Sequence, residues 1–285
     1  MNASAALEPL AFRKMHGAGN DFVVVDRRGG QAPLGPRLVR AIADRRRGIG
    51  CDQLVELIDA PGSDVGLRFR NADGSASAAC GNATRCVAAL LLDEGRGPDL
   101  AIAVEGRGRL AARCRDDGAV EVEMGAPALD WRGVPLAREV DTLALPLDGR
   151  PTAVGMGNPH CVHVVDRLDG LDWRAIGARV ERDPLFPERT NVQVVEVLSR
   201  ERVRARVWER GVGRTLASGS SACAIAVACH RRGLTDAHIH VEMEGGVLEA
   251  RWHAEGVALS GPVASVFEGT LSPAFLAARA EAVPA

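Results

Sequence analysis

The sequence has no excess of charge of either sign, and this absence excludes one class of partner. Its 285 residues contain 35 Lys and Arg against 37 Asp and Glu, which gives a net charge of -2 at pH 7. The arginines are scattered, and the only tight basic cluster, Arg45–Arg47, is expected to be a solvated helix end. Because a nucleic-acid-binding protein carries a basic stripe or patch, we expect no nucleic-acid partner.

Long apolar runs are also missing. No apolar stretch approaches the roughly 20 residues that a membrane helix needs, so we expect no membrane partner. The first residues, Met1–Ala6, lack the basic region and the long apolar core of a signal peptide. These two absences predict a cytoplasmic protein.

Cysteine pairing motifs are absent as well. The number of cysteines is odd, and no two of them form a Cys-x-x-Cys pair, so they are expected to be reduced thiols and mostly small buried residues. Histidine and cysteine never fall at ligand spacing, and His238-Ile239-His240 is more typical of a strand, so we expect no metal. The seven cysteines are Cys51, Cys80, Cys86, Cys114, Cys161, Cys223 and Cys229.

The sequence does contain an internal repeat. When the chain is displaced by 138 positions, Gly17-Ala18-Gly19-Asn20 falls on Gly155-Met156-Gly157-Asn158. The same gap-free register predicts that the protein is two copies of one unit. It also pairs Gln53 with Asn191, Asn71 with Glu209, Cys80 with Ser218, and Gly81 with Gly219.

The repeat predicts the fold of each unit. Segments 81–93 and 219–230 are apolar on nearly every face after their first turn, which is typical of a helix enclosed by other structure. Short β-branched runs flank both, so we expect an α+β fold of two pseudo-symmetric units. Each unit is a curled, mostly antiparallel sheet or barrel around a buried central helix. The expected strands are 22–26, 54–58, 65–70, 100–104, 108–113, 119–124, 238–242, 247–252 and 257–260.

One boundary is expected near residue 130. It separates an N-terminal unit, 1–130, from a C-terminal unit, 131–285, with a proline-punctuated linker between them. Residues 38–47 have helical spacing before Gly48. Residues 273–282 predict a final surface helix that could pack back on the first unit.

Cys80 and Ser218 immediately precede the two buried helices. The first turn of a helix has unsatisfied N–H groups and the positive end of the helix dipole, so it favours thiolate formation and can hold a carboxylate. Each residue also has a simpler interpretation. Cys80 could be a small buried residue that caps its helix, Asn20, Asn71 and Asn191 could be turn residues, His160 could be a hydrogen-bonded loop histidine, and Glu209-Arg210 could be a surface pair.

Several motifs, taken in order, resemble the diaminopimelate epimerase family. They are Lys14-Met-His-Gly-Ala-Gly-Asn-Asp-Phe22, Gly48-Ile-Gly-Cys-Asp-Gln53, Asn71-Ala-Asp-Gly-Ser75, Ala79-Cys-Gly-Asn82, Gly157-Asn-Pro-His160, Glu188-Arg-Thr-Asn191 and Trp208-Glu-Arg-Gly211. The resemblance covers residues 10–268. It implies an isomerase that needs no cofactor and inverts the α-carbon of LL-2,6-diaminopimelate to the meso form, a step toward lysine and peptidoglycan precursors.

The resemblance also implies roles for individual residues. Cys80 and the residue at position 218 would be the two acid–base groups, on opposite faces of the α-carbon, with His160 and Glu209 tuning their pKa values. A homodimer is implied too. The residues that would bind the amino-acid substrate are Asn20, Gln53, Asn71, Gly81, Asn82, Asn158, Asn191, Glu209, Arg210, Gly219 and Ser220, of which Arg210 suits the distal carboxylate.

The chain departs from the family pattern at both helix starts. Ser218 stands where the family has cysteine, Ser221 where glycine is common, and Ala83 after Asn82 where the family usually has Asn-Gly. A free thiol has a pKa of about 8.5, whereas a hydroxyl is a far weaker acid and needs a neighbouring base to act. Three functions therefore stay open: the epimerase with Ser218 as proton donor, a related racemase or a one-base isomerase or dehydratase of another small acid, and a binding protein without turnover.

Overall fold

The computed structural model describes residues 9–77, 81–115 and 117–278. The chain forms two compact units, each assembled from more than one segment. Unit 1 comprises the described residues of 9–17, 21–113 and 263–278, and unit 2 comprises 18–20 and those of 114–262. No helix within these described ranges is long and apolar enough to cross a membrane.

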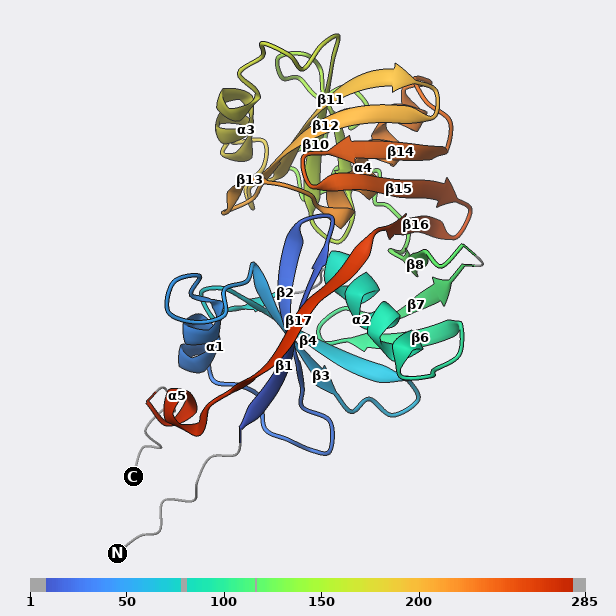
Figure 1. The fold of residues 1–285 in the computed structure, drawn as a ribbon. Coiled ribbons are helices and arrows are strands. Elements are labelled where there is room, and N and C mark those ends of the chain that lie inside the picture. Colours follow the sequence, from blue (N-terminus) through green and yellow to red (C-terminus); the bar gives the residue numbers. More distant parts are fainter. Residues whose placement is uncertain (1–8, 78–80, 116, 279–285) are drawn as a thin grey trace, which may run out of the picture. The chain divides into compact units, whose positions relative to one another are not determined.

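The sheet of unit 1 is mixed (Figure 1). β2 pairs with β3 in parallel, and the last strand of the chain, β17, pairs antiparallel with the first, β1. β3 and β4 are antiparallel, β4 and β6 parallel, and β6 and β7 antiparallel, with the short β5 on β4. The bounds are β1 Leu10–Gly17, β2 Asn20–Asp26, β3 Gln53–Ile58, β4 Val65–Asn71, β5 Ala76–Ser77, β6 Asp99–Val104, β7 Gly108–Cys114 and β17 Val263–Leu271.

The sheet of unit 2 follows the same order of connections. β9 and β10 are antiparallel, β10 and β11 parallel, β11 and β12 antiparallel, and β12 and β14 parallel. β15, β16 and β8 then extend the sheet by antiparallel pairing, with β13 on β12. The bounds are β8 Val120–Glu123, β9 Thr152–Gly155, β10 Pro159–Val165, β11 Asn191–Ser199, β12 Arg202–Glu209, β13 Gly213–Thr215, β14 His238–Met243, β15 Gly246–His253 and β16 Gly256–Gly261.

The internal repeat is confirmed element by element. α2, Gly81–Asp93, and α4, Gly219–Arg231, are displaced by 138 positions at both ends. β3 begins at Gln53 and β11 at Asn191, and each follows a parallel partner and precedes an antiparallel one. The predicted fold class is therefore confirmed, with two copies of one α+β unit.

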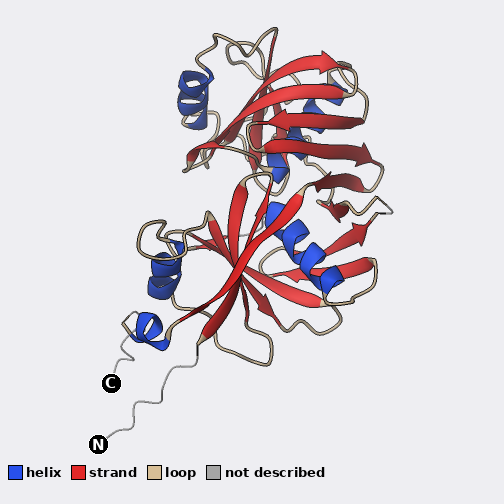
Figure 2. Cartoon of the chain, in the orientation of Figure 1, coloured by secondary structure: helices blue, strands red, loops and turns tan. Residues whose placement is uncertain are grey.

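The two central helices are enclosed because their sequences are apolar on nearly every side. In α4 every residue from Ser221 to Cys229 is buried, and the helix contacts β9, β10, β11, β14, β15 and β16. A sheet can reach a helix from that many strands only if it curls around the helix, and Figure 2 shows the strands of unit 2 passing in front of α4. α2 is buried in the same way and contacts β1 and β17.

Two predicted helices are shorter in the structure. The segment expected as a helix over 38–47 is α1, Pro36–Ala43, because the N–H groups of Ile49 and Gly50 turn back to the carbonyl of Ile42. A side chain at Gly48 would lie 2.0 Å from the Ala41 carbonyl oxygen, so only glycine allows this tight return. The helix expected over 273–282 is α5, Pro273–Ala277, and residues 279–282 of this prediction lie outside the described residues. Leu276 of α5 joins the core cluster that contains α1 in unit 1.

The expected linker is part of the unit 2 core. Val134, Leu136 and Leu145 are buried in one cluster with residues of β9, β10 and α3, Trp173–Glu181. The division between the units also differs from a single boundary near residue 130. It falls at 113/114 and at 262/263, because β8 pairs with β16 and β17 returns to β1.

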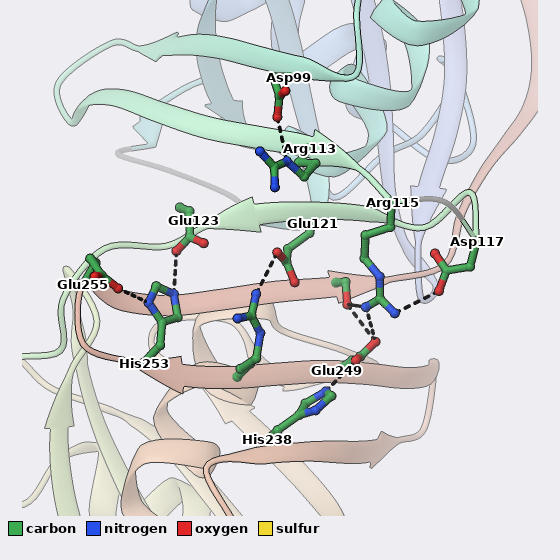
Figure 3. Close-up of polar contacts among 12 residues, drawn as sticks. Asp99, Arg113, Arg115, Asp117, Glu121, Glu123, His238, Glu249, His253 and Glu255 are labelled. Carbon is green, nitrogen blue, oxygen red and sulfur yellow. Dashed lines mark hydrogen bonds and ion pairs between the residues drawn. The ribbon is translucent and has the colours of Figure 1, made fainter.

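Ion pairs reinforce the position of β8 in unit 2 (Figure 3). Arg251 of β15 binds Glu121 of β8 at 3.0 Å, and His253 Nε2 lies 3.0 Å from Glu123. Arg115, just before β8, contacts Glu249 of β15 at 2.9 Å. The strand that ends the first copy of the repeat is thus bound to unit 2 by side chains as well as by main-chain pairing.

Candidate active site

Ser218 lies at the start of α4, as the sequence predicted. It is the N-cap residue, with extended backbone angles of φ -146° and ψ 121°, and its carbonyl accepts the first helical hydrogen bond, from Ala222 N at 3.0 Å. Its side chain is buried and makes no capping bond. The Ser218 hydroxyl oxygen therefore accepts no hydrogen bond from the N–H groups in the first turn of its own helix.

Gly219 and Ser220 form the first turn after Ser218. Gly219 is buried and Ser220 is half-buried. The equivalent turn of unit 1 begins with Gly81 and the fully buried Asn82. Cys80 lies outside the described residues, so its position in the site stays a prediction.

Gln53 and Asn71 lie together in unit 1. They are directly opposed on β3 and β4, and the Gln53 amide donates to Asn71 Oδ1 and to Ser77 Oγ, both at 3.1 Å. Asn71 in turn donates to Ser75 Oγ at 3.0 Å, and Gly74 N bonds to Asn71 O in the expected turn. The two predicted substrate-binding amides therefore form one ordered, half-buried group.

The hairpin that carries Asn20 is fixed by charged side chains beside it. In unit 1, Lys14 Nζ lies 2.5 Å from Asp21 and also bonds to the Gly50 carbonyl, and Arg45 contacts Asp21 at 2.7 Å. Burial opposes ionisation of Asp21, but hydrogen bonds from Arg45 and Lys14 outweigh it and lower the pKa of that carboxyl. Asn20 is half-buried and is assigned to unit 2 by its contacts.

His160 is fully buried on β10, and both of its ring nitrogens are engaged. Nε2 lies 2.8 Å from Asn158 Oδ1, and Nδ1 lies 3.0 Å from the amide nitrogen of Gln193. Burial, aided by the positive charge of Arg210, lowers the pKa of His160 to about 3. The imidazole is therefore neutral at pH 7, and its hydrogen bonds are to amides rather than to a carboxylate.

The turn after β12 presents Glu209 and Arg210, and two side chains hold it. Asn191 Oδ1 accepts from Arg210 N at 2.9 Å, while Asn191 Nδ2 donates to the Pro159 carbonyl at 3.1 Å. From the other side, Glu181 of α3 accepts from Trp208 Nε1 at 2.8 Å and from Gly211 N at 2.9 Å. The predicted residues Asn191, Glu209 and Arg210 therefore lie on one rigid segment.

Arg210 has an exchangeable partner. Its Nη1 donates to the Glu188 carbonyl at 3.0 Å, and the residue is half-buried. A carboxylate offers a guanidinium two charge-assisted bonds in place of this single neutral one. The turn can therefore bind a carboxylate without moving its backbone.

Glu181, Gln193 and Ser221 were not predicted as site residues. Burial favours the protonated form of Glu181, but the bonds from Trp208 and Gly211 hold the pKa of its carboxyl below the usual value. No motif marks Glu181. Gln193 could have been found from its place two residues after Asn191, on the same face of β11, and Ser221 from its departure from the common glycine.

No group of three or more His, Cys, Asp or Glu side chains is placed to hold a metal ion within the described ranges. Unit 1 offers a pair of amide groups on neighbouring strands. Unit 2 offers a helix start, a buried neutral histidine and a turn that carries an arginine. The groups of unit 2 suit the binding of a carboxylate and proton transfer by side chains.

Comparison with known proteins gives the family. The family model described as diaminopimelate epimerase matches residues 12–129 and 152–266. The chain belongs to the diaminopimelate epimerase family. The resemblance seen in the motifs is thereby confirmed, and as a member of this family the chain is an isomerase that binds a small-molecule substrate.

Two relatives show the extent of the similarity. The diaminopimelate epimerase of Acidiphilium cryptum is 49% identical over 278 residues, which cover 96% of this chain and 99% of the relative. That of Rhodospirillum centenum is 48% identical and covers 93% of each chain. The family assignment therefore applies to the whole architecture, both repeats included.

Solved structures show the same fold at low sequence identity. A phenazine biosynthesis protein of Bacillus anthracis has a TM-score of 0.67 at 14% identity, over 93% of this chain and 99% of that chain. A hydroxyproline epimerase of Agrobacterium vitis has a TM-score of 0.62 at 16% identity, over 93% and 92%. These likenesses support the fold class alone.

Proposed function

We propose that this epimerase inverts the α-carbon of LL-2,6-diaminopimelate to give the meso form, without a cofactor. The observation that carries the proposal is the rigid turn of unit 2, on which Asn191 and Glu181 hold the backbone around Arg210. A substrate with a second amino-acid end provides a carboxylate for Arg210. A substrate that lacks this end would leave buried polar groups without partners, which costs affinity.

Cys80 and Ser218 are the two acid–base groups of this proposal. The Cys80 thiolate takes the α-proton, so that a C–H bond breaks and an S–H bond forms. The electron pair stays on the α-carbon, next to the substrate carboxylate. Ser218 then gives its hydroxyl proton to the opposite face, forming the new C–H bond. Water returns a proton to the serine oxygen, and the hydroxide so formed takes the proton of the Cys80 thiol, which restores the thiolate. Donors at a helix N-terminus stabilise negative charge on the carboxylate during this step.

Ser218 makes the two directions unequal. A hydroxyl gives a proton to a carbanion readily. It is a poor base toward a C–H bond, because the pKa of the hydroxyl lies far above neutral pH and the alkoxide is scarcely formed. The Ser218 side chain makes no capping bond, so its oxygen is not held by its own helix. We therefore expect solvent hydrogen to enter the α-position at different rates from the two stereoisomers.

The experiment is exchange in D₂O with LL-diaminopimelate and, separately, with the meso form. Deuterium at the α-carbon and the formation of the other stereoisomer are followed together, with Cys80→Ala as the control. Inversion that the control lacks supports the epimerase, and equal exchange from both stereoisomers would contradict the role of Ser218.

Two other functions have distinct outcomes in the same experiment. Exchange without inversion would identify a one-base isomerase or dehydratase of another small acid, or a related racemase if another amino acid is inverted. No exchange, together with ordinary thiol reactivity of Cys80, would identify a binding protein. The presence of Cys80, His160 and Glu209 together favours the epimerase, since a chain that had lost turnover would have no need of these residues.

Location and assembly complete the proposal. The six described cysteines form no disulfide, which is compatible with a protein that works in the reducing cytoplasm. We expect a homodimer, which the family resemblance implies. Sedimentation of the purified protein over a range of concentrations tests the assembly.

A further inference from the structure

Four side chains of unit 2 form a continuous polar chain that the reaction scheme does not use. Ser221 Oγ of α4 lies 2.9 Å from Gln193 Nε2 of β11, and the same nitrogen lies 3.0 Å from His160 Nδ1. The other ring nitrogen of His160 then lies 2.8 Å from Asn158 Oδ1. Ser221, Gln193 and His160 are each 0% exposed, whereas Asn158 is half-buried. We call these four residues the polar chain.

The direction of the hydrogen bonds fixes the proton on His160. An amide nitrogen only donates, so Gln193 makes Nδ1 an acceptor and leaves the ring proton on Nε2. Nε2–H then donates to Asn158 Oδ1. A second proton, on Nδ1, would face the Gln193 amide donor in a buried place, and burial and the charge of Arg210 already lower the pKa of His160.

The reverse placement of the Gln193 amide is less favourable. In the observed orientation its nitrogen has two acceptors, and its carbonyl oxygen is buried without a partner within the described part of the chain. Reversal would bury an NH₂ group with two unsatisfied donors in place of one unsatisfied oxygen. The observed orientation, and with it the tautomer, is therefore the preferred one.

The consequence appears at the outer end of the polar chain. Since the Oδ1 atom of Asn158 accepts from His160, its NH₂ group is the part of the amide that is left to meet a ligand. An NH₂ group donates and cannot accept. Asn158 therefore favours a ligand atom with lone pairs, such as a carboxylate oxygen, over an ammonium group.

We infer that Gln193 and Ser221 are positioning residues: they hold His160 as the neutral Nε2–H tautomer and thereby turn the NH₂ group of Asn158 toward a carboxylate of the substrate. This inference rests on the proposed function only for the identity of that substrate. The arrangement itself follows from the donors and acceptors of four side chains.

The other copy of the repeat provides independent support. In unit 1 the positions equivalent to His160, Gln193 and Ser221 are Phe22, Val55 and Ala83, all apolar and all 0% exposed. The same backbone thus packs well without any polar group at these three places. Only the position of Asn158 is polar in both copies, since its equivalent in unit 1 is Asn20. The polar chain is therefore a requirement of the site in unit 2 and not of the fold.

The test is ¹⁵N NMR of the histidine rings in the full-length protein, with His160 assigned through its absence in His160→Phe. We expect one protonated nitrogen, Nε2, and signals that do not change between pH 5 and pH 9. A signal from protonated Nδ1, or titration near pH 6.5, would overturn the inference. The NMR signals can be measured without turnover. They therefore test the inference about His160 separately from the proposed reaction.

Gln193→Glu sharpens the test. A carboxylate only accepts, so it should move the proton to Nδ1 or add a second one, and the KM for diaminopimelate should rise about tenfold with a smaller change in kcat, as expected for one misdirected hydrogen bond. Unchanged ring signals in this variant would also overturn the inference.

A second variant and a control complete the design. If Gln193→Glu does not fold, Ser221→Ala can be used instead. It removes only the hydroxyl that accepts from Gln193 and should give a mixture of the two tautomers of His160. A single Nε2–H species in this variant would contradict the role of Ser221. Glu196→Gln, on the same strand and bonded to Arg204, is the matched control and should leave the His160 signals unchanged.

Discussion

The two copies of the repeat differ in the buried polar groups at equivalent positions. In unit 1 the central helix carries Asn82, Thr84 and Arg85, all buried in the first turns of α2, where α4 of unit 2 has Ser220, Ala222 and Cys223. In unit 2 the strands carry buried His160 and Gln193, where unit 1 has the apolar Phe22 and Val55.

This difference separates what the fold needs from what the site needs. The helix bounds and the strand connections are the same in both units, so the backbone tolerates either arrangement of side chains. Apolar burial in the common positions stabilises both copies. The groups that differ between the copies are therefore the ones to alter in order to change activity without losing the structure.

The largest effect is expected at the residues that precede the helices. Cys80→Ala should lower the rate of inversion by about 10²–10⁴-fold, since it removes the stronger base. Ser218→Cys should instead make the exchange rates from the two stereoisomers more equal, because it gives both copies the same acid–base group. Parallel exchange assays in D₂O measure both, and a Cys80→Ala variant with full activity would disprove the assignment.

The next effect is a test of the polar chain against its apolar equivalents. The triple variant His160→Phe, Gln193→Val, Ser221→Ala copies unit 1 into unit 2. Both members of the two buried hydrogen bonds, Ser221–Gln193 and Gln193–His160, are removed together, and Asn158 is only half-buried. The free energy of unfolding should therefore stay within about 2 kcal/mol of the original, while kcat/KM should fall about 100-fold. Urea unfolding and steady-state kinetics give the two values. Loss of folding would show that the two cores are not interchangeable.

The pH dependence of the free energy of unfolding distinguishes the original protein from the triple variant. Burial lowers the pKa of His160 to about 3 and that of His163 to about 4, from an ordinary value of 6.5. Between these values and pH 6.5 the unfolded chain binds protons that the folded chain excludes. Each histidine therefore lowers stability by about 1.4 kcal/mol per pH unit as the pH falls below 6.5.

The His160→Phe triple variant retains only the contribution of His163. Urea unfolding between pH 6.5 and pH 4.5 should therefore show a pH slope about half that of the original protein in the part that arises from these two groups. An unchanged slope would mean that His160 is not buried as a neutral ring.

A smaller effect is expected at Glu181, whose equivalent in unit 1 is Ala43. Glu181→Gln keeps the shape of the side chain but weakens the charge-assisted bonds to Trp208 and Gly211. The turn with Arg210 should loosen, and the KM should rise about tenfold with little change in kcat. A fall in kcat alone would place Glu181 in the chemical step instead.

The smallest effect is expected at a surface pair. Asp99 and Arg113 of unit 1 form an ion pair of 2.6 Å, but their side chains are 68% and 67% exposed. Asp99→Asn should cost less than about 0.5 kcal/mol, because water and salt screen such pairs. Thermal unfolding measures this, and a cost above about 1 kcal/mol would show that the pair is better ordered than its exposure indicates.

Much of the fold could be predicted because the repeated elements are recognisable from short segments of the sequence. The apolar segments 81–93 and 219–230 predicted the two central helices almost to the residue, and the turn at Asn71 was recognised from composition. The pairing partners of β8 and β17 could not be predicted in this way. They depend on contacts between distant segments, and nothing local in residues 119–124 tells which strand they will join.

The site shows the same limit. Ser218 and Arg210 could be placed from their motifs, since each lies at a position fixed by a neighbouring helix or turn. Glu181 could not, because its importance arises from the groups that the fold brings to it. The neutral state of His160 was also not predictable, since it depends on full burial and on the amide that faces Nδ1.

The return of β17 to β1 has a consequence for the order in which the chain folds during synthesis. β1 is made long before its antiparallel partner, Val263–Leu271. Unit 1 therefore keeps an open strand edge until that partner is made, whereas the strands of unit 2 precede it in the chain. A released chain that ends before residue 263 should thus hold a folded second repeat and an unfinished first one.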